Sequence, residues 1–153
     1  RHSFPTRRSS DLARLKRLAD ARHELGDIIL ARLAKLPLKE RIALPFKSGP
    51  LVGKELLLVH GSPADPTEPF THDLTDDEMR ALLGDDPADI VVCGGSHVPF
   101  DRTVMDVRII NVGSLGEAIT TGAFGRHADA TFLDFTGGRL VVEQFTVPLE
   151  RAA

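Results

Sequence analysis

Apolar residues in the first quarter of the chain recur at the spacing of a helix. They are Leu12, Leu15, Leu18, Leu25, Ile28, Ile29, Leu33 and Leu36. Residues three and four apart share one face of a helix, so the spacing predicts an amphipathic helical region from Asp11 to Leu36. Gly26 and Asp27 can end one helix and cap the next, and Pro37 stops the second. We therefore expect two consecutive helices here.

Two short apolar runs follow, with a helical pattern between them. The run LLLVH, Leu56–His60, is apolar without alternation, as is typical of a strand covered on both faces. The second run is DIVVC, Asp89–Cys93. Between them, TDDE at Thr75–Glu78 has the form of a capping box, and Gly84 can end the helix. A strand, a helix and a strand predict a βαβ unit with parallel strands that are adjacent or nearly so.

The remaining patterns are typical of strands. RIALPFK, from Arg41 to Lys47, alternates like a half-buried strand, and a turn centred on Gly53 follows it. VRIINVGS, from Val107 to Ser114, predicts a strand that enters a turn. The segments ATFLDF, TGG and RLVVEQFTVP predict a hairpin between residues 130 and 148. The chain is therefore expected to form a mixed α/β domain with a β-rich C-terminal part.

Composition narrows the class of protein. The chain has 153 residues, 42% of them hydrophobic, which fits one globular domain with a core. With 19 basic and 22 acidic residues, the net charge of -3 gives no nucleic-acid-binding or anionic-lipid signature. No apolar run approaches the roughly 20 residues of a membrane span, so we expect no membrane association. The single cysteine, Cys93, excludes an internal disulfide and favours a cytoplasmic protein.

The first dozen residues differ in character from the rest. RHSFPTRRSSDL has Arg and Ser but no apolar core, so it is not a secretory signal. It resembles a peptide that arises when sequencing-adapter DNA is translated; a disordered Arg/Ser arm is the alternative. We therefore expect residues 1–12 to be a non-native or disordered N-terminal segment, and residues 13–150 to be a partial domain.

Candidate chemistry lies where the two parallel strands end. His60 ends the first strand, and His97 stands just beyond the second, in GGSHVPF. Ligands of open α/β sheets bind beyond the carboxyl ends of the strands, so these two imidazoles can converge. Imidazole suits Zn, Mn, Fe or Ni. Two histidines make an incomplete metal site, and the other ligands must come from elsewhere.

At these residues the chain resembles a calcineurin-like metallophosphoesterase. VHGSP, VVCGGSHVPF and IINVGS resemble, in order and spacing, the late motifs of the small bacterial and archaeal phosphodiesterases of that superfamily. The resemblance covers about residues 25–148 and implies a truncated αββα sandwich with mixed sheets. It also implies that His60 and His97 are metal ligands. It assigns supporting positions to Gly61, Gly94, Gly95, Asn111, Gly113 and Ser114.

The family pattern implies a hydrolase with two divalent metal ions, about 3.5–4 Å apart, that bind and activate a small phosphorylated substrate. This chain departs from that pattern. Gly95 stands where the family has the first histidine of Gly-His-x-His, and Val112 replaces a proline. The three early motifs, which would supply aspartates, an asparagine and a further histidine, are absent. DARHELGD, residues 20–27, lies in a helical pattern and predicts a solvated helix face. We therefore expect no retained catalytic residue, weak metal binding and little or no phosphatase activity.

Two other functional readings stay open. One is a non-catalytic scaffold or interaction protein with the phosphoesterase fold, which the loss of a ligand at Gly95 would permit. The other is a fragment of an α/β-hydrolase, in which His-Gly-x-Pro forms part of the oxyanion hole. That class requires Gly-x-Ser-x-Gly, and Val98 breaks the pattern after Ser96.

Several other polar residues are expected to have ordinary structural roles. His23, His72 and His127 stand in polar stretches and are predicted at the surface. Cys93 is expected to be a small core residue, because no basic partner that would activate it is evident. Asp101 and Arg102 are expected to take part in a surface ion pair. Loss of the early strands would expose apolar faces, so the isolated chain should aggregate or be partly unfolded.

Overall fold

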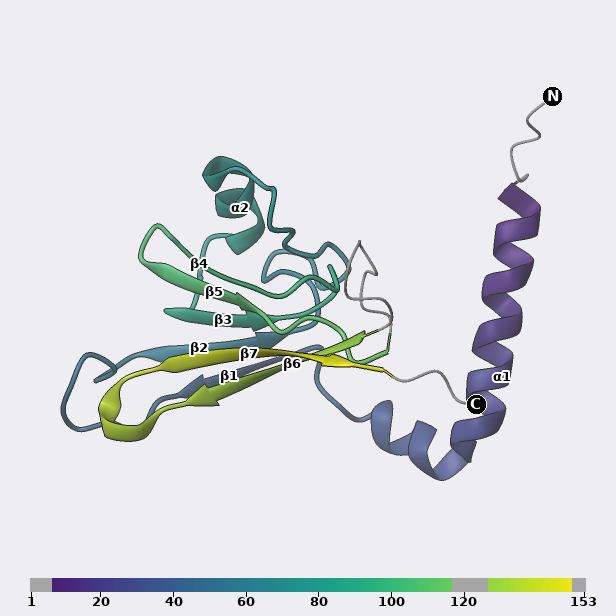
Figure 1. Ribbon diagram of the computed structural model, residues 1–153, viewed down its shortest axis with the longest axis horizontal. Coiled ribbons are helices and arrows are strands. Elements are labelled where there is room, and N and C mark those ends of the chain that lie inside the picture. The colour runs from purple at the N-terminus through teal and green to yellow at the C-terminus, as the bar shows by residue number, and fades with distance from the viewer. Residues whose placement is uncertain (1–6, 117–126, 150–153) are drawn as a thin grey trace. The chain divides into compact units, whose positions relative to one another are not determined.

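The computed structural model describes residues 7–116 and 127–149, in two units that we describe separately. The first unit, Arg1–Pro37, contains the helix α1 (Arg7–Leu33), and the second, Leu38–Ala153, contains the sheets (Figure 1). Within α1, Gly26 has a φ of 70° and a ψ of 164°, which breaks the helix in two. The two predicted helices are thereby confirmed. Residues 7–12, for which we expected a non-native or disordered segment, lie in α1; the origin of residues 1–12 stays a prediction.

The second unit is built on a five-stranded mixed sheet. In sequence order its strands are β1 (Lys39–Ala43), β2 (Glu55–Val59), β3 (Ile90–Cys93), β4 (Phe100–Val104) and β5 (Val107–Asn111). Their order in the sheet is β1-β2-β3-β5-β4. The three central strands β2, β3 and β5 are parallel, and the two outer strands are antiparallel to their neighbours. All three parallel strands therefore end at the same edge of the sheet.

The predicted βαβ unit is confirmed. Strand β2 pairs directly with β3, and α2 (Asp76–Leu83) lies between them in sequence. The Thr75 hydroxyl accepts a hydrogen bond from the Glu78 amide, and the Glu78 carboxylate accepts one from the Thr75 amide, which completes the capping box. Gly84 ends the helix with a φ of 73°.

Strand β4 was missed by the sequence reasoning. It forms a hairpin with β5 through Met105 and Asp106, whose φ angles are 50° and 67°. Such two-residue turns usually carry Asn-Gly or Asp-Gly, because both positions need a positive φ. Met-Asp does not carry that signal, so the turn was not recognised.

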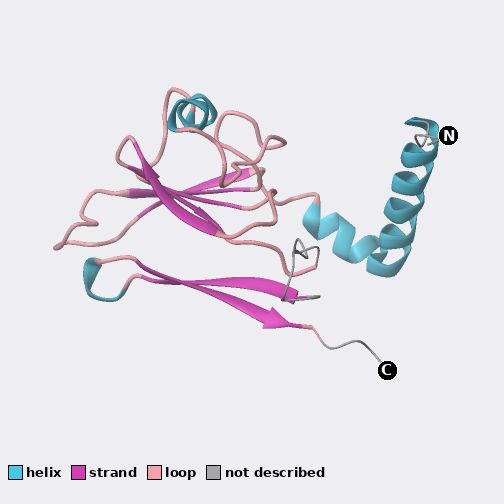
Figure 2. Cartoon of the chain, turned by 45° about the horizontal axis from the view of Figure 1, so that its top comes forward, coloured by secondary structure: helices cyan, strands magenta, loops and turns pink. Residues whose placement is uncertain are grey.

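A two-stranded hairpin forms the second sheet. Strands β6 (His127–Asp134) and β7 (Val141–Pro148) are antiparallel and are joined through the 3-10 turn η2 (Thr136–Gly138), as predicted. Figure 2 shows α2 on one side of the five-stranded sheet and the hairpin on the other. The second unit therefore has the α, β and β layers of a mixed sandwich.

Alternate residues of the parallel strands fill two separate cores. Leu57, Val91 and Ile109 face α2 and pack with Met79 and Leu83. The other face of the same strands is covered by the hairpin. It places Leu56, Ile90, Val92 and Ile110 against Leu133 and Val142. Burial on both faces explains why the strands carry unbroken apolar runs.

The outer face of the β6–β7 hairpin carries exposed apolar side chains. Phe132 is 59% exposed, and Val141, Phe145 and Val147 are about half exposed. Exposed apolar patches favour association. Aggregation of the isolated chain nevertheless stays a prediction.

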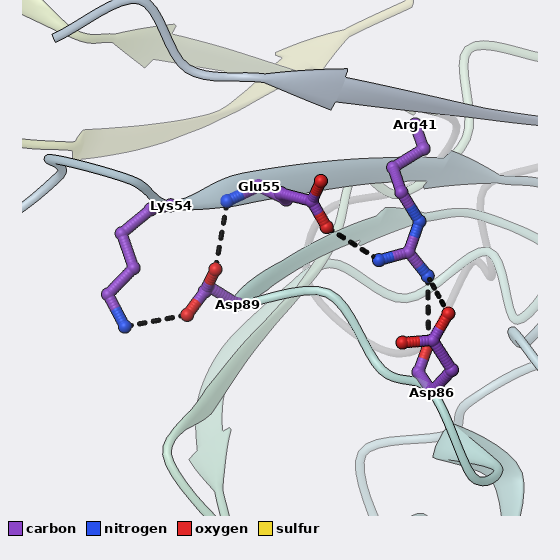
Figure 3. A network of polar contacts seen from close by, with 5 residues as sticks. All are labelled: Arg41, Lys54, Glu55, Asp86 and Asp89. Atoms are coloured by element: carbon purple, nitrogen blue, oxygen red, sulfur yellow. Dashed lines mark hydrogen bonds and ion pairs between the residues drawn. The ribbon is translucent and has the colours of Figure 1, made fainter.

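Ion pairs tie the β1–β2 hairpin to the segment before β3 (Figure 3). Arg41 donates to the Glu55 carboxylate at 2.7 Å and to the Asp86 carbonyl at 2.8 Å. The Asp89 carboxylate accepts from Lys54 Nζ at 2.6 Å and from the Glu55 amide at 2.8 Å. The contacts lie at the end of the sheet opposite to the carboxyl ends of β2 and β3.

Within the described residues, no helix is long and apolar enough to cross a membrane.

Candidate metal site

A cavity of about 520 Å³ lies at the carboxyl ends of β2, β3 and β5. Both predicted histidines line it. The complete lining is His60, Gly94, Gly95, His97, Val112, Gly113, Ser114, Leu115, Asp129, Ala130 and Thr131. The lining therefore includes every predicted site residue except Gly61 and Asn111.

The backbone around His60 is packed tightly. The Gly94 amide donates to the His60 carbonyl at 3.0 Å, which joins the turn after β2 to the turn after β3. A Cβ on Gly61 would lie 2.5 Å from the Pro66 carbonyl oxygen, so no larger residue fits at this position. Buried Ser62 donates its hydroxyl to the Asp65 carbonyl and accepts from the Asp65 amide. The Gly-Ser-Pro turn therefore fixes the backbone that carries the His60 imidazole.

His97 sits in an unusual backbone conformation. Its φ is 61°, in the left-handed region, which is uncommon for residues other than glycine, although histidine enters it more often than most. Such residues concentrate at functional sites, where the surrounding structure enforces the conformation. The imidazole of His97 is half-buried in the cavity wall.

Gly95 cannot simply be exchanged for the histidine of the family pattern. Its φ is 80°, and a Cβ there would lie 2.9 Å from Pro69 Cβ and 3.2 Å from the His60 carbonyl oxygen. Any side chain at this position would have to displace the loop that carries Pro69. The surrounding backbone therefore favours glycine at position 95 over the histidine of Gly-His-x-His.

Asn111 joins the turn after β5 to the turn after β3. It is fully buried, and its Nδ2 donates to the Gly94 carbonyl and to Ser96 Oγ, each at 2.9 Å. Its Oδ1 accepts from the Gly113 amide at 3.0 Å. Asn111 therefore lies behind the cavity wall and holds two of its turns together.

The sequence reasoning missed Asp129, which is a carboxylate of the cavity wall. Asp129 is 3% exposed and accepts from Thr146 Oγ1 at 3.0 Å. His127 was predicted at the surface, and this is wrong: its side chain is only 11% exposed, and its Nε2 lies 3.9 Å from Asp129 Oδ2. The sequence of β6, HADATFLD, gave no clear signal for Asp129, because polar and apolar residues stand on both of its faces.

The structural roles expected of the other polar residues are largely confirmed. Cys93 is buried, and this burial raises the pKa of its thiol to about 12, against a smaller opposite effect of a hydrogen bond with Asn111. His23 and His72 are exposed. Asp101 and Arg102 do form ion pairs, but not with each other: Asp101 pairs with Arg108, and Arg102 pairs with Asp76.

The described residues do not complete a metal cage. They contain no group of three His, Cys, Asp or Glu side chains arranged to hold a metal ion. Two imidazoles are suitable ligands for Zn, Mn, Fe or Ni, but a pair of metal ions needs more donors than these. The donor set therefore fits part of a metal site and does not fit a two-metal centre.

These features define a class of protein. The mixed α/β sandwich is the fold that the resemblance to calcineurin-like phosphoesterases implied. Comparison with known protein families matches residues 37–134, well over half of the chain, to the calcineurin-like phosphoesterase superfamily domain. The chain belongs to this superfamily.

One solved structure supports this fold. The hypothetical protein PH1004 from Pyrococcus horikoshii OT3 superposes with a TM-score of 0.63 at 20% identity, over 84% of this chain. The chain spans 47% of the length of that protein. Vps29 from Chaetomium thermophilum is also similar, with a TM-score of 0.46 at 19% identity, over 82% of this chain and 67% of its own. No curated protein matches the chain.

Proposed function

We propose that this chain is part of a metal-dependent phosphoesterase and contributes His60 and His97 to its metal site. The complete site would hold two divalent ions, with Mn, Fe, Ni or Zn as candidates, and would hydrolyse small phosphomonoesters or phosphodiesters in the cytoplasm. The remaining ligands would come from outside the described residues. One observation carries the proposal: both imidazoles line the same cavity, at the carboxyl ends of adjacent parallel strands.

The described residues support binding and positioning more than chemistry. His60 and His97 provide nitrogen donors, and the buried Asn111 amide fixes the two turns that flank them. Divalent ions held by His60, His97 and further ligands would supply Lewis-acid activation of a phosphate and of a water molecule. We assign no reaction step to the residues of this chain, because its described donors do not complete the cage.

One observation favours a second candidate, a non-catalytic scaffold or interaction protein. Gly95 lacks a ligand, and the Pro69 loop leaves no room for a side chain there. A member of the superfamily that no longer needs a metal could keep the fold and lose this ligand. Such a protein would bind no divalent ion at His60 and His97.

Calorimetric titration with Mn²⁺, together with hydrolysis of bis-p-nitrophenyl phosphate, separates the two candidates. The phosphoesterase proposal predicts binding that His60→Ala or His97→Ala abolishes and that exposed His72→Ala leaves unchanged. It also predicts no hydrolysis above the background rate, because the metal ligands among the described residues are incomplete. Absence of binding in the wild-type chain supports the scaffold. Turnover that depends on His97 would show that the missing ligands are present after all.

A further inference from the structure

We propose that the inward face of the β6–β7 hairpin is a positioning frame for the metal site and that Gln144 is its central residue. The frame consists of Asp129, Thr131 and Gln144. It rests on the proposed function, since it positions the turns that carry the site. None of the three residues belongs to the motifs from which the family resemblance was drawn.

Side chains of the frame donate hydrogen bonds to backbone carbonyls at the end of β5 and in the turn after it. Gln144 Nε2 donates to the Asn111 carbonyl at 2.9 Å and to the Phe100 carbonyl at 3.4 Å. Thr131, directly opposite Gln144 in the hairpin register, donates its hydroxyl to the Val112 carbonyl at 3.3 Å. These two side chains therefore bind two successive carbonyls of the turn.

Asp129 adds the third contact, two residues along the same strand. Its amide donates to the Ser114 carbonyl at 2.8 Å. A Cβ on Gly113 would lie 2.5 Å from Asp129 Cβ, which shows how closely the strand approaches the turn. The hairpin thus bonds to the end of β5 at Asn111 and to the turn after it at Val112 and Ser114.

Hydrogen bonds of Asn111 connect the frame to the segment that carries His97. The Asn111 carbonyl accepts a hydrogen bond from Gln144, and the Asn111 side-chain amide donates to the Gly94 carbonyl and to Ser96 Oγ. Ser96 directly precedes His97, whose φ is 61°. A shift of Asn111 therefore moves the segment that sets the direction of the His97 imidazole.

Gln144 suits a mutational test because its side chain is exposed apart from these contacts. Gln144→Leu removes the donor, whereas Glu143→Leu changes the neighbouring residue on the opposite face of the same strand. The probe is the metal-free 153-residue chain, observed by the ring ¹H–¹³C correlations of His97 and of exposed His72. We expect Gln144→Leu to shift or broaden the His97 peak and to leave the His72 peak in place, while Glu143→Leu leaves both in place.

The proposal is overturned if the His97 peak stays unchanged in Gln144→Leu, or if Glu143→Leu moves it equally. A parallel titration of both chains with Mn²⁺ separates this result from the proposed function. Loss of such contacts around metal ligands typically costs about 10–100-fold in affinity, and we expect Gln144→Leu near the lower end. If the wild-type chain binds no Mn²⁺ and the His97 peak still responds to Gln144→Leu, the frame stands and the metal-site proposal fails.

Discussion

Replacing Asn111 by alanine removes the buried side chain that joins the two turns of the cavity wall. The Gly113 amide then loses its acceptor, and the Gly94 carbonyl keeps the Ser96 amide as its remaining donor. Gly94 and Gly113 are both half-buried. We therefore expect Asn111→Ala to destabilise the fold as well as to disturb the site.

The size of the effect follows from one backbone group that loses its only partner and one that loses one of two donors. Each buried backbone group left without a partner costs about 1–3 kcal/mol. The Gly113 amide gives about 1–3 kcal/mol and the lost hydrogen bond to the Gly94 carbonyl about 0.5–1.5 kcal/mol, so we expect about 3 kcal/mol in total. A domain has about 5–15 kcal/mol of total stability, so the loss would be a large fraction of it. Ser96→Ala is the matched control. It removes only one acceptor of the Asn111 amide, and we expect a loss of about 1 kcal/mol or less.

Equilibrium urea unfolding, followed by far-UV circular dichroism, measures both variants. With a slope of about 1–3 kcal/mol per molar urea, a loss of 3 kcal/mol lowers the midpoint by about 1–3 M. The slope itself should stay unchanged. If Asn111→Ala shifts the midpoint no further than Ser96→Ala does, Asn111 does not hold the two turns together.

Three further predictions concern single positions. Gly113→Ala should destabilise the chain by more than about 2 kcal/mol, because a Cβ at this position clashes with Asp129 and the φ is positive. Gly137→Ala, with a similar φ but open space around it, should cost only about 1–2 kcal/mol. Equal losses of stability in thermal unfolding would contradict this difference. Cys93, whose thiol pKa is raised to about 12 by burial, should react with iodoacetamide at about pH 8 only as fast as the chain unfolds, and alkylation at the rate of a free thiol would show that it is accessible. The hydrogen bond from Lys54 holds the pKa of Asp89 below its ordinary value, so the stability gained from the carboxylate is present above about pH 4 and is lost as the pH falls through the lowered pKa. Asp89→Asn should therefore destabilise the chain at about pH 7 and much less at about pH 2, and a difference that did not change with pH would refute the assignment.

Local patterns were sufficient to predict most of the fold. The capping box at Thr75 and the unbroken apolar runs of β2 and β3 depend on neighbours in sequence and on burial of both faces, and both features are present. The β4–β5 turn at Met105 and Asp106 could not be predicted, because tertiary contacts impose its backbone conformation against the preference of its residues. Local rules therefore fail where the rest of the sheet determines the backbone.

The candidate site, like the fold, could be predicted only where local patterns determine the structure. His60 and His97 could be found because strand ends of a parallel sheet meet at one edge. Asp129 and Gln144 could not, because the β6–β7 hairpin alternates with apolar residues on both faces, and the pattern does not reveal which face turns inward. Only the packing of Leu133 and Val142 against the sheet determines this.

The central claim is that His60 and His97 belong to one metal site. Titration with Co²⁺, followed by the visible absorption of the imidazole-bound ion, tests it most directly in His60→Ala, His97→Ala and the double variant, with His72→Ala as control. We predict weak binding by the wild-type and His72→Ala chains, and the same complete loss of the absorption band in either single variant and in the double variant, because residues that act as one unit are not additive. Independent, additive losses from the two single variants, or a band that survives in both, would contradict a shared site.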